Sequence, residues 1–220
     1  MKILRIEIKN LSPLVLSSGS GVGTLIDTDI EWDYNELPVF SGRRLKGLLK
    51  ESAMEVQEFF EQSKLNKSFE ISKVGDLFGV QGGYKESKLK FYNLSLKDIS
   101  NISDYLEYLK NEYKNIFNVE IIKNSITQIR QQTAIDENGI EKKGSLRTIR
   151  ALNPNFTFSG EVILLDESQK NQNLLALACQ NLKHAGLNRN RGYGEVLVKL
   201  FDDNNELTKS VVEKLEKVVK

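Results

Sequence analysis

The segment 186–196 contains the residues with the clearest capacity for chemistry. It reads Gly186-Leu-Asn-Arg-Asn-Arg-Gly-Tyr-Gly-Glu-Val196, and it separates a helical pattern from a strand pattern. Glycine lets backbone N–H groups approach a phosphate closely, and guanidinium groups supply charge and forked donors. The segment therefore favours binding of a polyanion, and the alternative is an ordinary helix-to-strand turn in which Gly186 ends the helix. The candidate contacts are Gly186, Asn188, Arg189, Asn190, Arg191, Gly192 and Gly194.

A second basic cluster lies where the clearest helix begins. The helix is expected from Ser41, a plausible N-cap, and its first turns contain Arg43, Arg44, Lys46 and Lys50. Positive charge is unfavourable at this end of a helix because the helix dipole prefers negative charge there. The placement therefore indicates an anionic ligand that uses both the dipole and the side chains.

Acidic residues alternate in the segment before this helix, after a small-residue loop at 17–24. Asp27, Asp29, Glu31 and Asp33 have the spacing of a calcium loop, but Trp32 stands where such a loop needs glycine, and a proline replaces its bidentate glutamate. An EF-hand is therefore excluded. For Asp29, Glu31 and Asp33 we expect a solvated loop or an edge strand.

Composition restricts the remaining classes of function. The 220 residues are 40% hydrophobic and have a net charge of +1, so one domain with an ample core is expected and anion binding must come from local clusters. Cys179 and His184 are the only residues of their types, which excludes a disulfide framework and a structural zinc site. Cys179 is expected in the core. No apolar run approaches the length of a membrane span or a signal core, so we expect a cytoplasmic protein without a membrane partner.

Hydrophobic periodicity predicts an α+β fold. Strands are expected at 1–9, 88–96, 121–135, 145–152, 156–165 and 195–201, and helices at 41–60, 102–117, 173–185 and after 202. The order is compatible with a ferredoxin-like (RRM-like) βαββαβ core in a single domain, 1–220. Insertions are an acidic, glycine-rich loop at 17–40 and a protruding basic β-hairpin arm at 127–150, turned at 136–139. A glycine-punctuated turn with an apolar plug is expected at 74–83.

Each predicted helix has an apolar stripe expected to face the core. The stripes are Leu45, Leu48, Leu49, Val56, Phe59 and Phe60 in the first helix; Tyr105, Leu106, Leu109, Tyr113 and Ile116 in the second; and Leu174, Leu177, Ala178 and Leu182 in the third. The hairpin instead contains basic residues: Arg130, Lys142, Lys143, Arg147 and Arg150.

Four features in this order resemble the RAMP superfamily of CRISPR-associated proteins. They are the motif at 37–50, the Leu77-Phe-Gly79 turn, the Arg130-Gln-Gln-Thr-Ala-Ile-Asp136 stretch with Phe158-Ser-Gly160, and the glycine-rich loop. The chain is most similar to the single-domain backbone subunit of type III effector complexes. The resemblance implies a guide RNA, a complementary target RNA, copies of the chain and other effector subunits as partners. It also implies RNA contacts from the loop and from Arg43, Arg44, Lys46, Lys50, Arg130, Gln131 and Thr133.

In that subfamily an aspartate in the loop before the proline motif cuts target RNA, and counting back from Pro38 places Asp27 there. The resemblance thus implies Asp27 as catalytic residue and ligand of Mg²⁺ or another divalent cation, with Asp29 as the second choice. Two departures are Ser41-Gly-Arg-Arg44 in place of Pro-Gly-Ser-Ser, and Asp29 in place of a proline. The alternatives are a non-catalytic structural RNA-binding subunit and a guide-processing endoribonuclease. The latter enzymes typically use an early histidine, whereas this chain has only His184.

Overall fold

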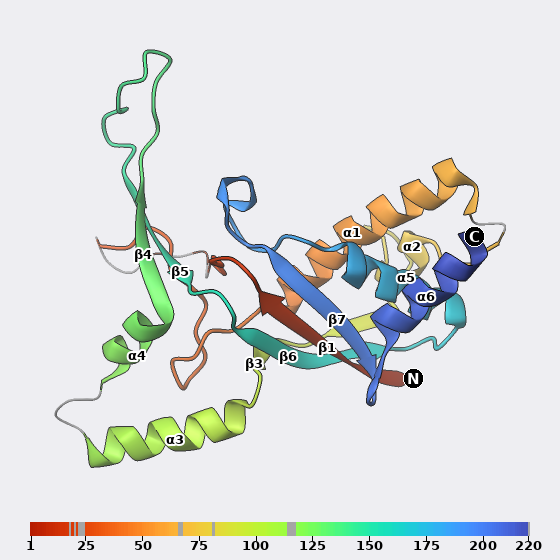
Figure 1. The fold of residues 1–220 in the computed structure, drawn as a ribbon, viewed down its shortest axis with the longest axis horizontal. Helices are drawn as coiled ribbons and strands as arrows, with labels where there is room; N and C mark the ends of the chain where they lie inside the picture. The colour runs from red at the N-terminus through yellow and green to blue at the C-terminus, as the bar shows by residue number, and fades with distance from the viewer. Residues whose placement is uncertain are drawn as a thin grey trace.

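The centre of the computed structural model is an antiparallel sheet with strand order β2-β6-β1-β7-β8, and β3 also pairs with β6 (Figure 1). The structure describes residues 1–17, 19, 21, 25–65, 68–80, 82–113 and 118–219. The strands of this sheet are β1 (Lys2–Asn10), β2 (Leu89–Phe91), β3 (Ser95–Leu96), β6 (Thr157–Leu164), β7 (Val196–Asp202) and β8 (Asn205–Glu206). Most of the small-residue loop expected at 17–24 lies outside the described residues.

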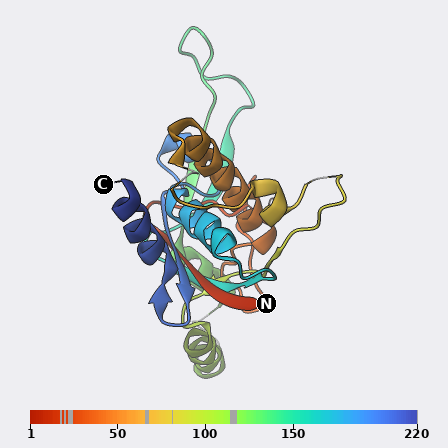
Figure 2. The same ribbon diagram turned by 90° about the vertical axis from the view of Figure 1, so that its right-hand side faces the viewer.

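Helices cover one face of this sheet. The helices are α1 (Gly42–Ser63), α2 (Val74–Phe78), α3 (Ile99–Glu112), α4 (Val119–Ile126), α5 (Gln169–Asn181) and α6 (Leu207–Val219). Of these, α1, α5 and α6 gather against the sheet (Figure 2). The strand pattern explains why, since Leu4, Ile6 and Ile8 of β1 are fully buried while the alternate positions of the strand are not.

The βαββαβ core expected from the sequence is confirmed. It consists of β1, α1, β2, β6, α5 and β7, and the spatial order β2-β6-β1-β7 places each strand beside the partners that a ferredoxin-like sheet requires. Within β6, Gly160 lies under Leu94, and a Cβ at Gly160 would come within 2.4 Å of the Leu94 Cδ2 atom. This close approach gives the Phe158-Ser-Gly160 motif a packing reason.

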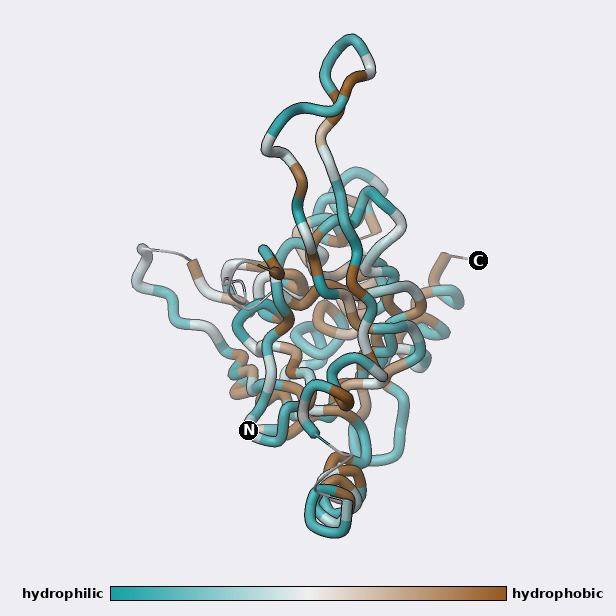
Figure 3. The backbone as a smooth tube through the Cα atoms, turned by 90° about the vertical axis from the view of Figure 1, so that its left-hand side faces the viewer, coloured by the Kyte–Doolittle hydropathy of each residue, from teal (hydrophilic) through white to brown (hydrophobic). Residues whose placement is uncertain are grey.

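The arm is a separate two-stranded sheet that projects from the body (Figure 1). It consists of β4 (Thr127–Gln132) and β5 (Arg147–Leu152), and the Asp136 carboxylate accepts hydrogen bonds from two backbone amides in its turn. Figure 3 shows a mainly hydrophilic arm with short hydrophobic stretches. The strand predicted at 121–135 is wrong in its first half, because Asn118 caps helix α4 there by accepting from the Ile121 N–H.

Two predicted apolar stripes are wrong in part. Tyr105 of α3 and Tyr113, which directly follows the helix, are exposed. The helix lies at the edge of the body and contacts the core through Ile99, Ile102 and Leu106. Phe59 of α1 is also exposed. Ile116 and the end predicted for the second helix lie outside the described residues, and the stripe of α5 is buried as expected.

The strand predicted at 88–96 is interrupted, because residues 92–94 leave β6 to meet the start of α1. Asn93 accepts a hydrogen bond from the Gly42 N–H, and Leu94 pairs with Phe40. Helix α5 begins four residues earlier than predicted. Its first turn buries polar side chains such as Asn171 and Asn173, whose amides donate to backbone carbonyls, so hydropathy alone did not reveal it.

Candidate nucleic-acid interface

The glycine-rich loop is closed at its base by two glycines. Gly186 and Gly194 have φ values of 78° and 77°, and a Cβ atom would lie 2.6 Å from the Val15 carbonyl oxygen at the first and 2.0 Å from the Ala185 carbonyl oxygen at the second. Both positions therefore need glycine for packing as well as for backbone conformation. Between them Arg189–Arg191 form a single 3-10 turn after Asn188, which is left-handed. Gly192, in contrast, has open space around it.

The two arginines of the loop connect it to two other parts of the interface. Arg189 lies 3.6 Å from a carboxylate oxygen of Glu51 on α1, and Arg191 donates a 3.1 Å hydrogen bond to the Gln132 side chain at the end of β4. Asn190 is exposed between them. The loop thus lies between α1 and the arm, and both guanidinium groups remain accessible to solvent.

A hollow of about 440 Å³ lies where α1 meets the loop. Its lining comprises Ser17, Arg44, Gly47, Leu48, Glu51, Gly186 and Leu187. Two of the three predicted basic regions, the start of α1 and the glycine-rich loop, therefore meet at this hollow. Ser17, from the segment that precedes Asp27, also lines it. Leu187 donates its N–H to the Val15 carbonyl, which fixes the loop against that segment.

The start of α1 differs from the expectation in one respect. The Gly42 N–H donates a hydrogen bond to the Asn93 side-chain oxygen. The Tyr92 carbonyl oxygen also lies close, since a Cβ at Gly42 would be 2.4 Å from it. The helix end is therefore covered by the backbone, and Ser41 makes no side-chain capping bond. A ligand of α1 must be held by the side chains of its first turns. Arg43, Lys46 and Lys50 line a different hollow from that of Arg44.

Asp27 is hydrogen-bonded to strand β5 of the arm. Its N–H donates to the Thr148 carbonyl at 2.9 Å, and its Oδ2 accepts from the Thr148 N–H at 2.7 Å. Its Oδ1 lies 3.9 Å from the Arg147 guanidinium, and 45% of the side chain is exposed. On the other side of β5, Thr148 is paired with Gln131 of β4. Strand β5 therefore lies between Gln131, a predicted RNA contact, and the Asp27 carboxylate. Asp27 is thus held by one carboxylate oxygen, and its half-exposed side chain lies beside Arg147 of the arm.

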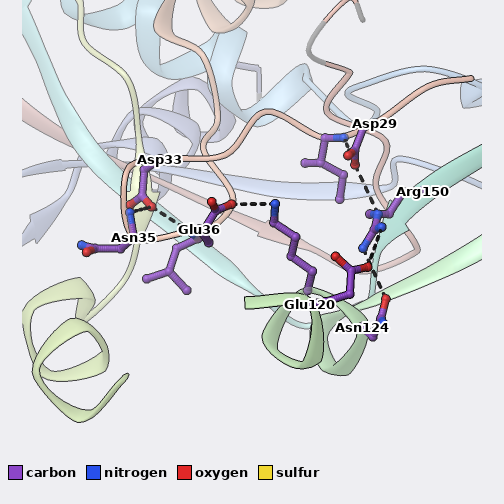
Figure 4. A network of polar contacts seen from close by, with 10 residues as sticks. Asp29, Asp33, Asn35, Glu36, Glu120, Asn124 and Arg150 are labelled. Atoms are coloured by element: carbon purple, nitrogen blue, oxygen red, sulfur yellow. Dashed lines mark hydrogen bonds and ion pairs between the residues drawn. The ribbon is translucent and has the colours of Figure 1, made fainter. Parts of the chain in front are cut away.

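Asp29 is buried, so the expectation that it is solvated is wrong. Its carboxylate Oδ1 lies 3.3 Å from Nε of Arg150, which is 4% exposed and also approaches Glu120 and Asn124 of α4 (Figure 4). Arg150 therefore does not belong to the basic surface of the arm. Burial is tolerated because the two charges lie together. The second choice for a catalytic carboxylate is thus occupied in an internal ion pair.

The rest of the acidic segment also has structural contacts. Asp33 accepts hydrogen bonds from the N–H groups of Asn35 and Leu37, and Glu36 lies 2.6 Å from Lys123 of α4 (Figure 4). Together with Arg150, these contacts fasten the acidic segment to the base of the arm. Asp27, in contrast, is attached to Thr148 of β5 and its side chain is 45% exposed.

Other predicted contacts lie farther along the arm. Arg130 is exposed and its Nε donates to Gln128, while the Thr133 hydroxyl contacts Glu141 and Ser145. Ser17, Glu51 and Thr148 were not predicted from the sequence. Their roles depend on contacts between distant segments, and no residue pattern marks them.

The single cysteine and the single histidine of the chain lie outside the contacts described above. Cys179 is fully buried, and burial raises the pKa of its thiol, which fits a core residue. His184 is exposed and pairs through its backbone with Glu195. Within the described ranges no three or more His, Cys, Asp or Glu side chains are grouped as a metal site. In the same part of the chain, no helix combines the length and apolar character needed to cross a membrane.

Comparisons with known proteins agree with this fold. The family model described as RAMP superfamily matches residues 7–197. A cryo-electron microscopy structure of type III-B Cmr-beta bound to cognate target RNA contains a chain with a TM-score of 0.63 and 14% identity, covering 96% of this chain and 99% of that chain. A chain of the apo Cmr-beta structure gives 0.60 and 14%, covering 92% and 98%. No curated protein matches the sequence.

Proposed function

Because this chain belongs to the RAMP superfamily, we propose that it is a guide-RNA-binding backbone subunit of a type III CRISPR effector complex that cleaves bound target RNA in antiviral defence. The observation that carries the proposal is the meeting of α1, the glycine-rich loop and the arm beside an exposed aspartate. Guanidinium groups of the loop contact both neighbouring elements. The partners proposed are guide RNA, complementary target RNA, copies of the chain and other effector subunits. The Cmr-beta structure of similar fold is bound to cognate target RNA, which supports the target as one of them.

The RNA-binding part of the proposal rests on accessible positive charge around the hollow of Arg44 and Gly186. Arg189 and Arg191 have surface partners only, and surface ion pairs contribute at most about 1 kcal/mol, so a phosphate can replace them. Arginine forks suit phosphate oxygens, and Gly192 leaves room for close approach. These contacts recognise the backbone and shape of the RNA, so sequence specificity comes from base pairing between guide and target.

The cleavage part rests on Asp27. Ser17 lines the hollow and forms a β-bridge with Ile30. Because Ile30 follows Asp27 by three residues, Asp27 is separated from this bridge by about 10 Å of extended chain. The exposed carboxylate oxygen is a hard ligand of the kind that Mg²⁺ uses, and one or two such ligands suffice beside substrate phosphates. A bound divalent cation would supply charge stabilisation at the phosphate. Thr148 and the loop residues would orient Asp27 and the RNA.

A non-catalytic structural subunit is the second candidate function, and one observation favours it. Asp27 Oδ2 already accepts the Thr148 N–H, and the described residues contain no group of three or more His, Cys, Asp or Glu side chains that could hold a metal ion. A guide-processing endoribonuclease has less support, because such enzymes typically use an early histidine. The histidine of this chain, His184, lies late in the sequence, in a hollow that adjoins that of Arg44 and is also lined by Arg189. The deciding experiment is reconstitution of the subunit with guide RNA, followed by incubation with complementary RNA in magnesium. Cleavage by the wild-type assembly supports the first candidate, and stable binding without cleavage supports the second.

The loop arginines provide a direct test of RNA binding. Replacing Arg189 and Arg191 with alanine should lower the salt slope of single-stranded RNA binding by about 1.4, because each lost phosphate contact removes about 0.7. Fluorescence anisotropy from low to moderate salt measures this slope. Lys214→Ala with Lys217→Ala is the control, since both lysines are exposed on α6. Equal slopes for the two double variants would remove the loop from the interface.

Gly47 allows stability and binding to be separated. It lies inside α1, and a Cβ there would have no atom within 4 Å apart from the local backbone of the helix and its chain neighbours. Gly47→Ala should therefore raise the free energy of unfolding by about 0.5–1 kcal/mol. Gly47→Leu should fold equally well but fill the hollow and weaken RNA binding about tenfold, roughly 1.4 kcal/mol. Urea unfolding and anisotropy measure the two quantities, and equal RNA affinity of the Ala and Leu variants would contradict the assignment.

A further inference from the structure

A second hollow, of about 370 Å³, lies on the other side of Gly47, between α1 and the loop after α2. This loop comprises residues 79, 80 and 82–87. The hollow is lined by Arg43, Lys46 and Lys50 of α1 and by Lys85 and Ser87 of the loop, with apolar atoms beneath. Among the described residues that line it there is no acidic side chain. The neighbouring hollow farther along α1 differs in this respect, because Glu58 and Glu61 contribute to its wall.

The positive groups of this hollow have few countercharges. The Lys50 ammonium donates to the Gly79 carbonyl at 2.9 Å, so its partner is neutral. Burial, together with the nearby charge of Lys50, lowers the pKa of Lys46. The Lys85 ammonium lies 2.6 Å from Asp76, an ion pair at the surface. An anion placed between the two walls would relieve this accumulation of positive charge.

We infer that this hollow binds a phosphate group of the RNA backbone, with Lys85 and Ser87 as contacts in addition to the basic side chains of α1. Gly47 lines both hollows, so the strand would cross α1 over the open space at this glycine. The identity of the phosphate as that of RNA rests on the proposed function. Asp76 then competes with RNA for Lys85, and this relation gives the inference its test.

Lys85 and Asp76 should act in opposite directions. Lys85→Gln should lower the salt slope of single-stranded RNA binding by about 0.7 and weaken binding several-fold, because one phosphate contact is lost. Asp76→Asn should tighten binding, because the ammonium is released from its surface partner. Lys90→Gln and Glu86→Gln are the charge-matched controls, since both residues are exposed and do not line the hollow. Equal slopes for Lys85→Gln and Lys90→Gln, or equal affinities for Asp76→Asn and Glu86→Gln, would overturn the inference.

Competition experiments separate RNA from a small phosphate ligand. Inorganic phosphate and a mononucleotide are titrated into wild-type protein and the Lys85→Gln variant. Weak competition by both compounds, with the Lys85 effect confined to RNA, supports a backbone subsite. Loss of mononucleotide binding in Lys85→Gln without a change in the RNA slope would overturn the assignment to RNA. If the wild-type protein binds no RNA, the proposed function itself fails, whereas an effect of Arg189 and Arg191 without an effect of Lys85 removes only this subsite.

Discussion

Replacing Arg150 with methionine should lower the free energy of unfolding by about 3–5 kcal/mol, since removing one partner of a buried ion pair leaves the other charge uncompensated. The partner is Asp29, which lies in the acidic segment and is as deeply buried as Arg150. Urea unfolding monitored by circular dichroism measures the change. A loss of less than about 1 kcal/mol would mean that the pair does not hold the segment to the arm.

Two further variants assign the effect to the pair. Glu120→Gln removes the outer, exposed partner of Arg150 and should cost at most about 1 kcal/mol. Asp29→Asn combined with Arg150→Met should cost less than the sum of the two single changes, because the double variant leaves no unpaired charge. Additive costs would contradict direct coupling between these side chains.

The same pair links stability to the geometry of the site. Thr148 lies two residues from Arg150 on β5, and its N–H donates to the Asp27 carboxylate. We therefore expect the Thr148 amide to exchange with solvent faster in Arg150→Met than in Glu120→Gln. Hydrogen exchange thus tests whether the ion pair positions Asp27 as well as stabilising the fold.

The core of this fold was predictable because its pattern is local. Leu4, Ile6 and Ile8 alternate with polar residues along β1, and the stripe of α5 repeats at helical spacing, so each element indicates its own buried face. The segment 119–126 lacks such a signal. Its isoleucines suit a strand, and the cap supplied by Asn118, with the packing of Ile122, decides for a helix.

The candidate site was predictable by residue type, but its arrangement was not. Basic residues and glycines identified α1, the arm and the loop. The assignment of Arg44 and Lys46 to different hollows depends on the rotation of α1, and the burial of Asp29 depends on a partner 121 residues away. Spacing along the chain contains no information on such contacts. The loop after α2, with Lys85, therefore remained unassigned until its position beside α1 was known.

Asp27→Asn should reduce cleavage of complementary RNA by the assembled complex at least about 100-fold, while changing RNA affinity by less than about twofold. The substitution removes the charge that would hold a divalent cation, and the loss corresponds to about 3 kcal/mol of transition-state stabilisation. Asparagine keeps an oxygen that can accept the Thr148 N–H, so the attachment to β5 is preserved. Single-turnover cleavage in magnesium and anisotropy without magnesium measure the two quantities.

The control for charge is Asp203→Asn, because Asp203 is exposed in the turn between β7 and β8 and asparagine tolerates its positive φ of 52°. This control should cut RNA at the wild-type rate. If Asp27→Asn also cuts at that rate, Asp27 is not the catalytic residue. Because Asp29 is held by Arg150, cleavage would then have to come from a group outside the acidic segment or from a neighbouring subunit. If the wild-type assembly binds complementary RNA and leaves it intact in magnesium and manganese, the exposed oxygen of Asp27 has no catalytic role and the subunit is structural.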